Sequence, residues 1–153
     1  VNSKNIIKLK TKIFNSYLKK NKLKLRSGVK EIIKYCKKQE IKLALVSSTS
    51  KNNINSIFFC LRDSLNKKDF DFVGNSKLVK KLKPSAEIYK LALKELRLKP
   101  KECIAIEDTQ ESLNSAIKAK LKCFIFPGNF HTSKKFNGAF KEVSKINKNI
   151  FKS

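Results

Sequence analysis

The sequence predicts an α/β protein with a doubly wound parallel sheet. Short apolar runs alternate along the chain with stretches of helical spacing, and polar residues bound each run. The runs are apolar throughout, which is typical of parallel strands covered by helices on both faces. With 153 residues, 41% of them hydrophobic, the chain is long enough for one domain with one core.

The elements are expected in a regular order. Residues 4–20 carry apolar side chains near helical spacing and predict an amphipathic helix, which the segment ending at Gly28 interrupts. A helix over 84–98 is expected to hold Pro84 in its first turn, where the missing N–H costs little. The other predicted elements are helices over 29–39, from the turn after residue 46 to about 61, over 109–120 and over 136–148, and strands over 41–46, 69–74, 102–107 and 121–126.

The charge and the cysteines exclude several classes of function. The net charge is +24, but only three of the 36 basic residues are arginines and the lysines are dispersed, which disfavours a specific nucleic-acid binder. An anionic small molecule fits the same charge. The four cysteines form no CxxC pair and His131 is the single histidine, so no zinc site is predicted; Cys103 and Cys123 lie in apolar runs and are expected to be reduced core residues. No apolar run has the length of a membrane span, and a soluble, intracellular protein is expected.

Polar loops follow the predicted strands, where ligands bind in sheets of this kind. Ser47–Asn53 places hydroxyls, a lysine and an asparagine at a helix start, which suits a phosphate group, although an ordinary helix N-cap explains the same residues. Lys83 stands before the helix of 84–98, where it could reach a phosphoryl group or simply be solvated.

Glu107 and Asp108 end the strand of 102–107. Two adjacent carboxylates repel each other unless a cation or hydrogen-bond donors satisfy them, and Mg²⁺ is a natural partner. The alternative is that Asp108 is the N-cap of the next helix.

Taken together, these loops resemble motifs II, III and IV of the haloacid dehalogenase (HAD) superfamily of phosphohydrolases, in its CbbY-like and β-phosphoglucomutase-like branch. The resemblance runs from about residue 7 to 139. The segments that carry it are LKTKIF (9–14), LRSGV (25–29), ALVSSTSKN (44–52), LKPSAEIYKLAL (82–93), CIAIEDT (103–109) and GNFHT…FNGA (128–139).

The resemblance implies roles for these positions. Ser48 is the hydroxyl that binds the transferring phosphoryl group, with Ser47 as the alternative if the register shifts by one. Lys83 bridges phosphoryl and nucleophile, and Asp108 with Glu107 holds Mg²⁺. The loop with Thr49, Ser50, Lys51 and Asn52 contacts substrate and its second phosphate, and Lys10 is the basic residue of the cap helix. A small phosphorylated sugar is the implied substrate, and the cytoplasm, or alternatively the plastid stroma, the implied compartment.

The first motif of that family, an apolar strand ending in DxDG(T/S) with the attacking Asp, has no match here. Asp69 and Asp71 have the DxD spacing but follow polar residues and precede no Gly, and Asp63 has no second acid two positions on. The chain also has no Met and begins at Val1, so we expect that a preceding segment is missing. Residues 1–24 then correspond to the end of a helical cap and 25–153 to a core without its first strand. In the family that strand lies between the strands that here end at Ser47 and Glu107.

Smaller departures concern the helix packing. The family usually has Gly where Ser112 and Lys120 stand, and Arg-Pro-Gly where this chain has Arg26-Ser27-Gly28.

Three hypotheses follow. The first is a Mg²⁺-dependent phosphatase of sugar phosphates that works through an aspartyl-phosphate, here inactive and of marginal stability without the nucleophile, with a sugar phosphomutase as its variant. The second is a non-catalytic phosphate-binding remnant. The third, ranked last, is a basic nucleic-acid-binding protein.

Overall fold

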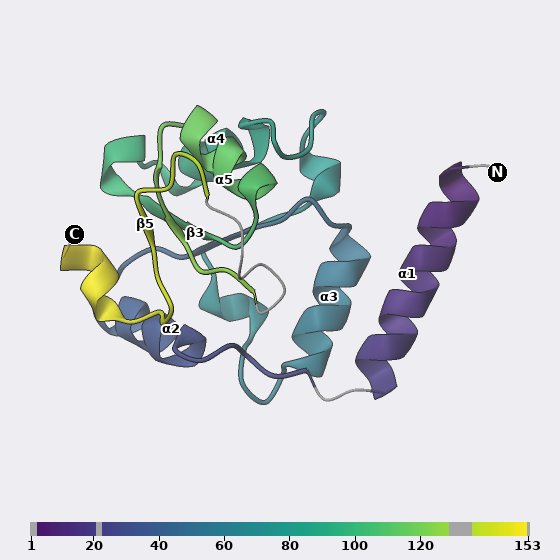
Figure 1. Ribbon diagram of the computed structural model, residues 1–153. Coiled ribbons are helices and arrows are strands. Elements are labelled where there is room, and N and C mark those ends of the chain that lie inside the picture. The colour runs from purple at the N-terminus through teal and green to yellow at the C-terminus, as the bar shows by residue number, and fades with distance from the viewer. Residues whose placement is uncertain (1–2, 21–22, 129–135, 153) are drawn as a thin grey trace.

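The computed structural model describes residues 3–20, 23–128 and 136–152, which form helices around parallel strands (Figure 1). The helices are α1 (Ser3–Lys20), α2 (Val29–Lys38), α3 (Lys51–Cys60), α4 (Glu87–Leu96) and α5 (Gln110–Lys118), with 3-10 turns at Lys67–Asp69, Ser76–Leu78, Pro100–Glu102 and Lys148–Lys152. The strands are β1 (Ala44–Val46), β2 (Phe72–Gly74), β3 (Ile104–Glu107), β4 (Lys122–Ile125) and β5 (Lys141–Glu142).

The strands form two parallel sheets. β1 pairs with β2, and β3, β4 and β5 pair in that order. The predicted α/β class with parallel strands is therefore confirmed. Within the described residues no ladder joins β1 to β3, so the single sheet that the sequence predicts is divided at this point.

The side chains of β4 show why helices cover both faces of the larger sheet. Cys123 and Ile125 pack with α4 and α5, while Phe124 and Phe126 pack with Ile33 and its neighbours on α2. Successive side chains of a strand point to opposite faces, so an uninterrupted apolar run requires an apolar layer on each side. This is the doubly wound arrangement that the apolar runs predict.

Helix α2 begins at a glycine for a steric reason. Gly28 has φ 85°, and a Cβ at this position would stand 2.0 Å from the backbone oxygen of Ile146. Only glycine combines this backbone conformation with so close an approach. The entry to α2 is thereby tied to the C-terminal segment of the chain.

Helix α1 lies alongside α3 at one side of the molecule (Figure 1). Leu18 of α1 is buried, and its carbonyl accepts a hydrogen bond from Cys60 Sγ of α3 at 3.5 Å. Ile6, Leu9 and Ile13 of the same helix are exposed. Of the helices described, none is both long enough and apolar enough to cross a membrane.

The helix predicted over 136–148 is wrong. The chain instead forms β5, whose flanks hydrogen-bond to β4: Phe140 N–H donates to the carbonyl of Cys123, and Val143 N–H to that of Ile125. The free edge of β4 offers acceptors that a local helix would leave unused, and Gly138, at φ 86°, breaks a helical path.

Other elements are present but shorter than predicted. The helix expected from 84 begins at Glu87, because Pro84 belongs to a preceding turn in which Ser85 N–H donates to Leu82 O. The strand expected over 69–74 begins at Phe72, because Asn66 and Asp69 close a 3-10 turn by capping each other. The strand expected over 41–46 pairs only from Ala44.

Candidate functional site

A pocket of about 310 Å³ opens where β1 and β3 end. Its position at the carboxyl ends of parallel strands is where ligands bind in folds of this type. The residues that line it are Val46, Ser47, Ser48, Lys83, Glu107, Asp108, Glu111 and Ser112. The structure therefore brings together the three separate loops that the sequence singled out.

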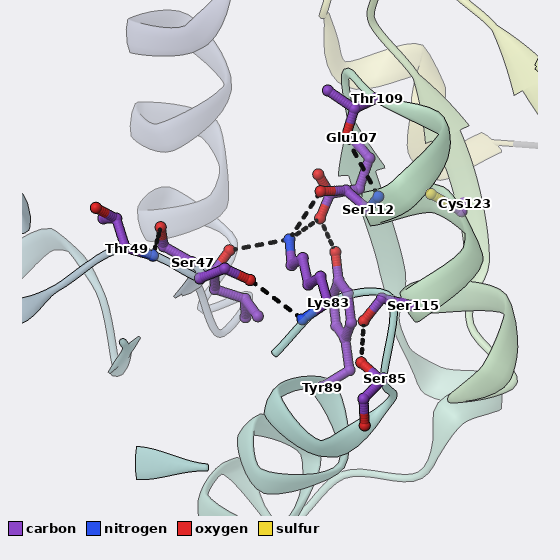
Figure 2. A network of polar contacts seen from close by, with 12 residues as sticks. Ser47, Thr49, Lys83, Ser85, Tyr89, Glu107, Thr109, Ser112, Ser115 and Cys123 are labelled. Carbon is purple, nitrogen blue, oxygen red and sulfur yellow. Dashed lines mark hydrogen bonds and ion pairs between the residues drawn. The ribbon is translucent and has the colours of Figure 1, made fainter. Parts of the chain in front are cut away.

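Lys83 is the central side chain of this pocket. Its side chain is 6% exposed, and its ammonium lies 2.6 Å from Glu107 Oε1. It also donates to the carbonyl of Val46 at 3.3 Å and to Ser112 Oγ at 3.4 Å (Figure 2). One buried cation thus connects the end of β1 with the end of β3 across the division between the sheets.

Tyr89, on α4, completes the environment of Glu107. Its hydroxyl donates to the same Oε1 atom that binds Lys83, and its ring centroid lies 5.1 Å from the Lys83 ammonium. Burial, and next the charge of Glu107, raise the pKa of Tyr89 well above its ordinary value. The phenol is therefore neutral at physiological pH and remains a donor to the carboxylate.

The two candidate hydroxyls after β1 make different contacts. Ser48 Oγ accepts a hydrogen bond from the backbone N–H of Lys83 at 3.3 Å, whereas Ser47 Oγ accepts from Thr49 N–H at 3.1 Å. Both line the pocket. Ser48 is the one that is hydrogen-bonded to the Lys83 segment.

The other predicted substrate-binding residues lie outside the pocket lining. Ser50 is the N-cap of α3, accepting from Asn53 N–H, and Thr49 Oγ1 accepts from Asn53 Nδ2. Lys51 and Asn52 are exposed on the first turn of α3, and Lys10 is exposed on α1. The ordinary N-cap interpretation is therefore confirmed for Ser50.

The two predicted metal ligands differ in what already satisfies them. Glu107 receives two donors, Lys83 and Tyr89, whereas Asp108 is exposed. The alternative role of Asp108 as a helix N-cap is wrong, because Thr109 caps α5 by accepting from Ser112 N–H at 3.2 Å. The carboxylate of Asp108 is therefore not used to cap α5.

The donor set fits Mg²⁺ as part of a larger coordination shell. No cluster of three histidine, cysteine or acidic side chains suited to a metal occurs in the described portion of the chain. Mg²⁺ at phosphate sites usually takes one or two carboxylates, the remaining ligands being waters and phosphate oxygens. Asp108, with Glu107 beside it, meets that requirement in part.

Three residues of the site were not predicted as functional: Glu111 and Ser112, which line the pocket, and Tyr89, which contacts Glu107. Tyr89 follows the apolar face of its helix and gives no separate signal in the sequence. Ser112 could have been found, because it stands where a glycine is expected. Cys123, also near the site, is no nucleophile at neutral pH, since burial and then Glu107 raise its pKa to about 12.

The chain is similar to known proteins over most of its length. The sequence profile of the haloacid dehalogenase-like hydrolases matches residues 1–126. Protein CbbY of Cereibacter sphaeroides is 31% identical over 134 residues, covering 88% of this chain and 58% of its own length. A phosphorylated carbohydrates phosphatase of Thermotoga maritima is 32% identical over 113 residues, covering 74% of this chain and 49% of its own.

A solved structure shows the same fold. The crystal structure of CbbY from Rhodobacter sphaeroides with xylulose-(1,5)bisphosphate superposes with a TM-score of 0.84 at 30% identity, covering 92% of this chain and 63% of that one. The present chain spans less than two thirds of the length of these relatives. Since the family profile covers most of its residues, the chain belongs to the haloacid dehalogenase-like hydrolase family.

Proposed function

We propose that this chain carries the phosphate-binding and metal-binding part of a Mg²⁺-dependent phosphohydrolase that acts on a small sugar phosphate or sugar bisphosphate. The observation that supports it is the pocket, where a buried ammonium, three serine hydroxyls and two adjacent carboxylates meet. Ammonium and hydroxyl donors suit phosphoryl oxygens, and carboxylates suit a divalent cation.

Each residue has a role in the proposal. Ser48 donates its hydroxyl to a phosphoryl oxygen, and Lys83, whose side chain is 6% exposed, supplies positive charge. Fixed donors of this kind stabilise charge that develops during phosphoryl transfer. Asp108 and Glu107 would hold Mg²⁺, which when bound neutralises negative charge on the phosphoryl group.

The attacking carboxylate is proposed to lie outside these 153 residues. Asp108 is assigned to the metal, Asp69 pairs with Lys37, and Asp71 accepts from Leu43 N–H. In the proposed reaction an aspartate oxygen attacks phosphorus and the sugar oxygen leaves, which gives an aspartyl-phosphate. Water then releases inorganic phosphate; transfer to a sugar hydroxyl instead would make the protein a phosphomutase.

The proposed substrate class is supported by the relatives. One is a phosphorylated carbohydrates phosphatase, and another was crystallised with a sugar bisphosphate. In a bisphosphate, the second phosphate is proposed to contact the loop of Thr49–Asn52, where Lys51 and Asn52 are exposed. Lys10, exposed on α1, is the proposed contact from the cap.

The proposal is tested by binding and by turnover. The 153-residue chain is titrated with xylulose-1,5-bisphosphate in the presence of Mg²⁺, and release of inorganic phosphate is assayed in parallel. We expect binding without turnover, and weaker binding by tenfold or more in K83M and D108N, because each removes a charge from the pocket. Lys38→Met, on the exposed surface of α2, is the control for the lost charge.

Two outcomes would contradict the proposal. If wild type and K83M bind the bisphosphate equally, the pocket is not the phosphate site. If the chain releases phosphate at a rate above background, the nucleophile lies within these residues and its assignment outside them is wrong.

A further inference from the structure

The hydrogen-bonding capacity of Lys83 is fully used within the protein. An ammonium group has three N–H donors. Three acceptors surround it: Glu107 Oε1 at 2.6 Å, the Val46 carbonyl at 3.3 Å and Ser112 Oγ at 3.4 Å. A direct contact from Lys83 to a ligand would therefore require that one of these contacts be given up.

Ser112 lies next to this cation in the pocket. It lies in the first turn of α5, lines the pocket and is partly exposed, whereas the side chain of Lys83 is 6% exposed (Figure 2). Its hydroxyl oxygen accepts from Lys83, which leaves its own hydrogen to donate. In the described part of the chain that hydrogen has no protein acceptor.

The hydroxyl, and not the backbone, is the donor at this position. The backbone N–H of Ser112 is already bonded to Thr109 Oγ1 at 3.2 Å. A glycine in place of Ser112 would present only that occupied N–H. The serine therefore adds one donor to the pocket, and the ammonium on the other side of the oxygen polarises its O–H bond.

We propose that Ser112 is a further phosphate-binding residue. Its hydroxyl donates to a phosphoryl oxygen while its oxygen accepts from Lys83, so that it bridges the cation and the ligand. This inference rests on the proposed function, because it takes the pocket as the phosphate site. It assigns to the chain a contact that Ser48 and Lys83 do not supply. Ser112 faces the ligand from α5, whereas Ser48 faces it from the end of β1.

The test is the affinity for inorganic phosphate, measured on the 153-residue chain by NMR at about 0.15 M salt. The backbone amides of Ser48, Lys83 and Ser112 are followed, since their shifts separate binding in the pocket from diffuse attraction to the basic surface. We expect Ser112→Ala to raise the dissociation constant about tenfold, the effect of losing one hydrogen bond to a charged group. Ser112→Thr keeps a hydroxyl and is expected to stay within about twofold of wild type.

Two further variants serve to interpret the phosphate affinity of Ser112→Ala. Ser56→Ala, on α3 and outside the pocket lining, controls for serine-to-alanine exchange in a helix and should bind like wild type. Lys83→Met should weaken binding at least as much as Ser112→Ala. If Ser112→Ala binds phosphate as well as wild type or better while Lys83→Met weakens binding, the role of Ser112 is refuted and the proposed function stands. If wild type shows no saturable shift in the pocket, or Lys83→Met leaves the affinity unchanged, the proposed function and this inference both fail.

Discussion

At the scale of single residues, the buried contact of Lys83 with Glu107 governs the chemistry of the pocket. Both side chains are at most 10% exposed, so each has lost most of its hydration. An ion pair in that position is stable only when further hydrogen bonds compensate for the lost water. Tyr89 and Ser112 provide those contacts. Ser112 thus both supports the pair and lines the pocket.

Removing the phenol hydroxyl tests that support. Tyr89→Phe keeps the ring in the core but takes one of two donors from Glu107, and the free energy of unfolding should fall by about 1.5–3 kcal/mol, typical for a hydrogen bond to a charged group. Tyr35→Phe is the control, because Tyr35 contributes a ring stacked on Phe151 and should change stability by less than about 0.5 kcal/mol. Urea unfolding at pH 7 measures both, and equal effects would show that the Glu107 contact is not stabilising.

An ion pair on the surface gives a pH-dependent contribution. The hydrogen bond from Lys37, and next that from the backbone of Asn66, lowers the pKa of Asp69. A carboxyl with a lowered pKa stabilises the fold above its unfolded pKa, and that contribution disappears as the pH falls through the folded value. Lys37→Met should therefore reduce stability at pH 7 by up to about 1 kcal/mol, whereas with Asp69 protonated near pH 2 it should have only the effect of removing one positive charge.

The matched control for this variant is Lys38→Met. Lys38 is exposed on the same helix, so it reports the benefit of removing one positive charge from a protein of net charge +24. Denaturant titrations of both variants at the two pH values are compared. A difference between them that persists at pH 2 would contradict the assignment to Asp69.

At the scale of elements, helix α2 depends on the glycine before it. Gly28 and Gly138 have nearly the same backbone conformation, φ 85° and 86°. A Cβ at Gly28 would meet the backbone oxygen of Ile146, whereas a Cβ at Gly138 would meet only the end of the Ile117 side chain, at 2.8 Å. Alanine at either position would therefore have the same conformational cost, but the steric cost would be higher at Gly28.

This pair makes a direct comparison possible. Gly138→Ala should lower the free energy of unfolding by about 1–2 kcal/mol, the cost of a left-handed backbone in alanine. Gly28→Ala should cost distinctly more, because backbone atoms cannot move aside as a flexible side chain can. Thermal or urea unfolding measures both losses of stability. Equal losses would mean that the backbone at the start of α2 moves to accommodate the added methyl group.

Also at this scale, the polar loops before α3 and α5 serve two purposes. Ser50 and Thr109 cap the helices, while Ser48 and Asp108, two positions and one position earlier, remain available to the pocket. A helix that is already capped by its own side chain leaves the preceding residues free for ligand chemistry. Capping and binding are thus distributed over neighbouring residues of one loop.

At the scale of the whole molecule, the division between the two sheets is the main structural feature. β4 pairs with a strand on each side, while β1 and β3 each pair on one side only among the residues that the structure describes. Unpaired strand edges are sites of association and aggregation. We propose that a strand from a preceding segment occupies this position in a longer protein, with residues 1–24 as the end of its cap.

Hydrogen exchange measures the consequence. In the 153-residue chain, the backbone amides of β4 should exchange more slowly than those of β1, because hydrogen bonds on both sides and helices on both faces protect β4. NMR exchange at pH 7 gives residue-specific rates. If β1 is protected as strongly as β4, its second edge is paired in solution and the division between the sheets does not persist there.

The sequence alone determined the features that depend on neighbouring residues. Apolar runs and helical spacing predicted helices α1 to α5 and strands β1 to β4 correctly in order and type, because burial on both faces leaves a continuous apolar run in the chain. The three loops at the strand ends were recognisable by their polar residues and spacing. The same residues and spacing also sufficed to recognise the haloacid dehalogenase family.

The tertiary structure decided what depends on distant partners. β5 formed because β4 had a free edge to pair with. The sequence of residues 136–148 gives no indication of that edge. The buried contact of Lys83 with Glu107, 24 residues apart, and the donation from Tyr89 arise only when α4 packs against β3 and its neighbours. Likewise the pocket placed Ser112 beside Lys83 and left Lys10 and Thr49–Asn52 outside its lining. Contacts between segments far apart in the chain are set by packing, which local sequence patterns do not specify.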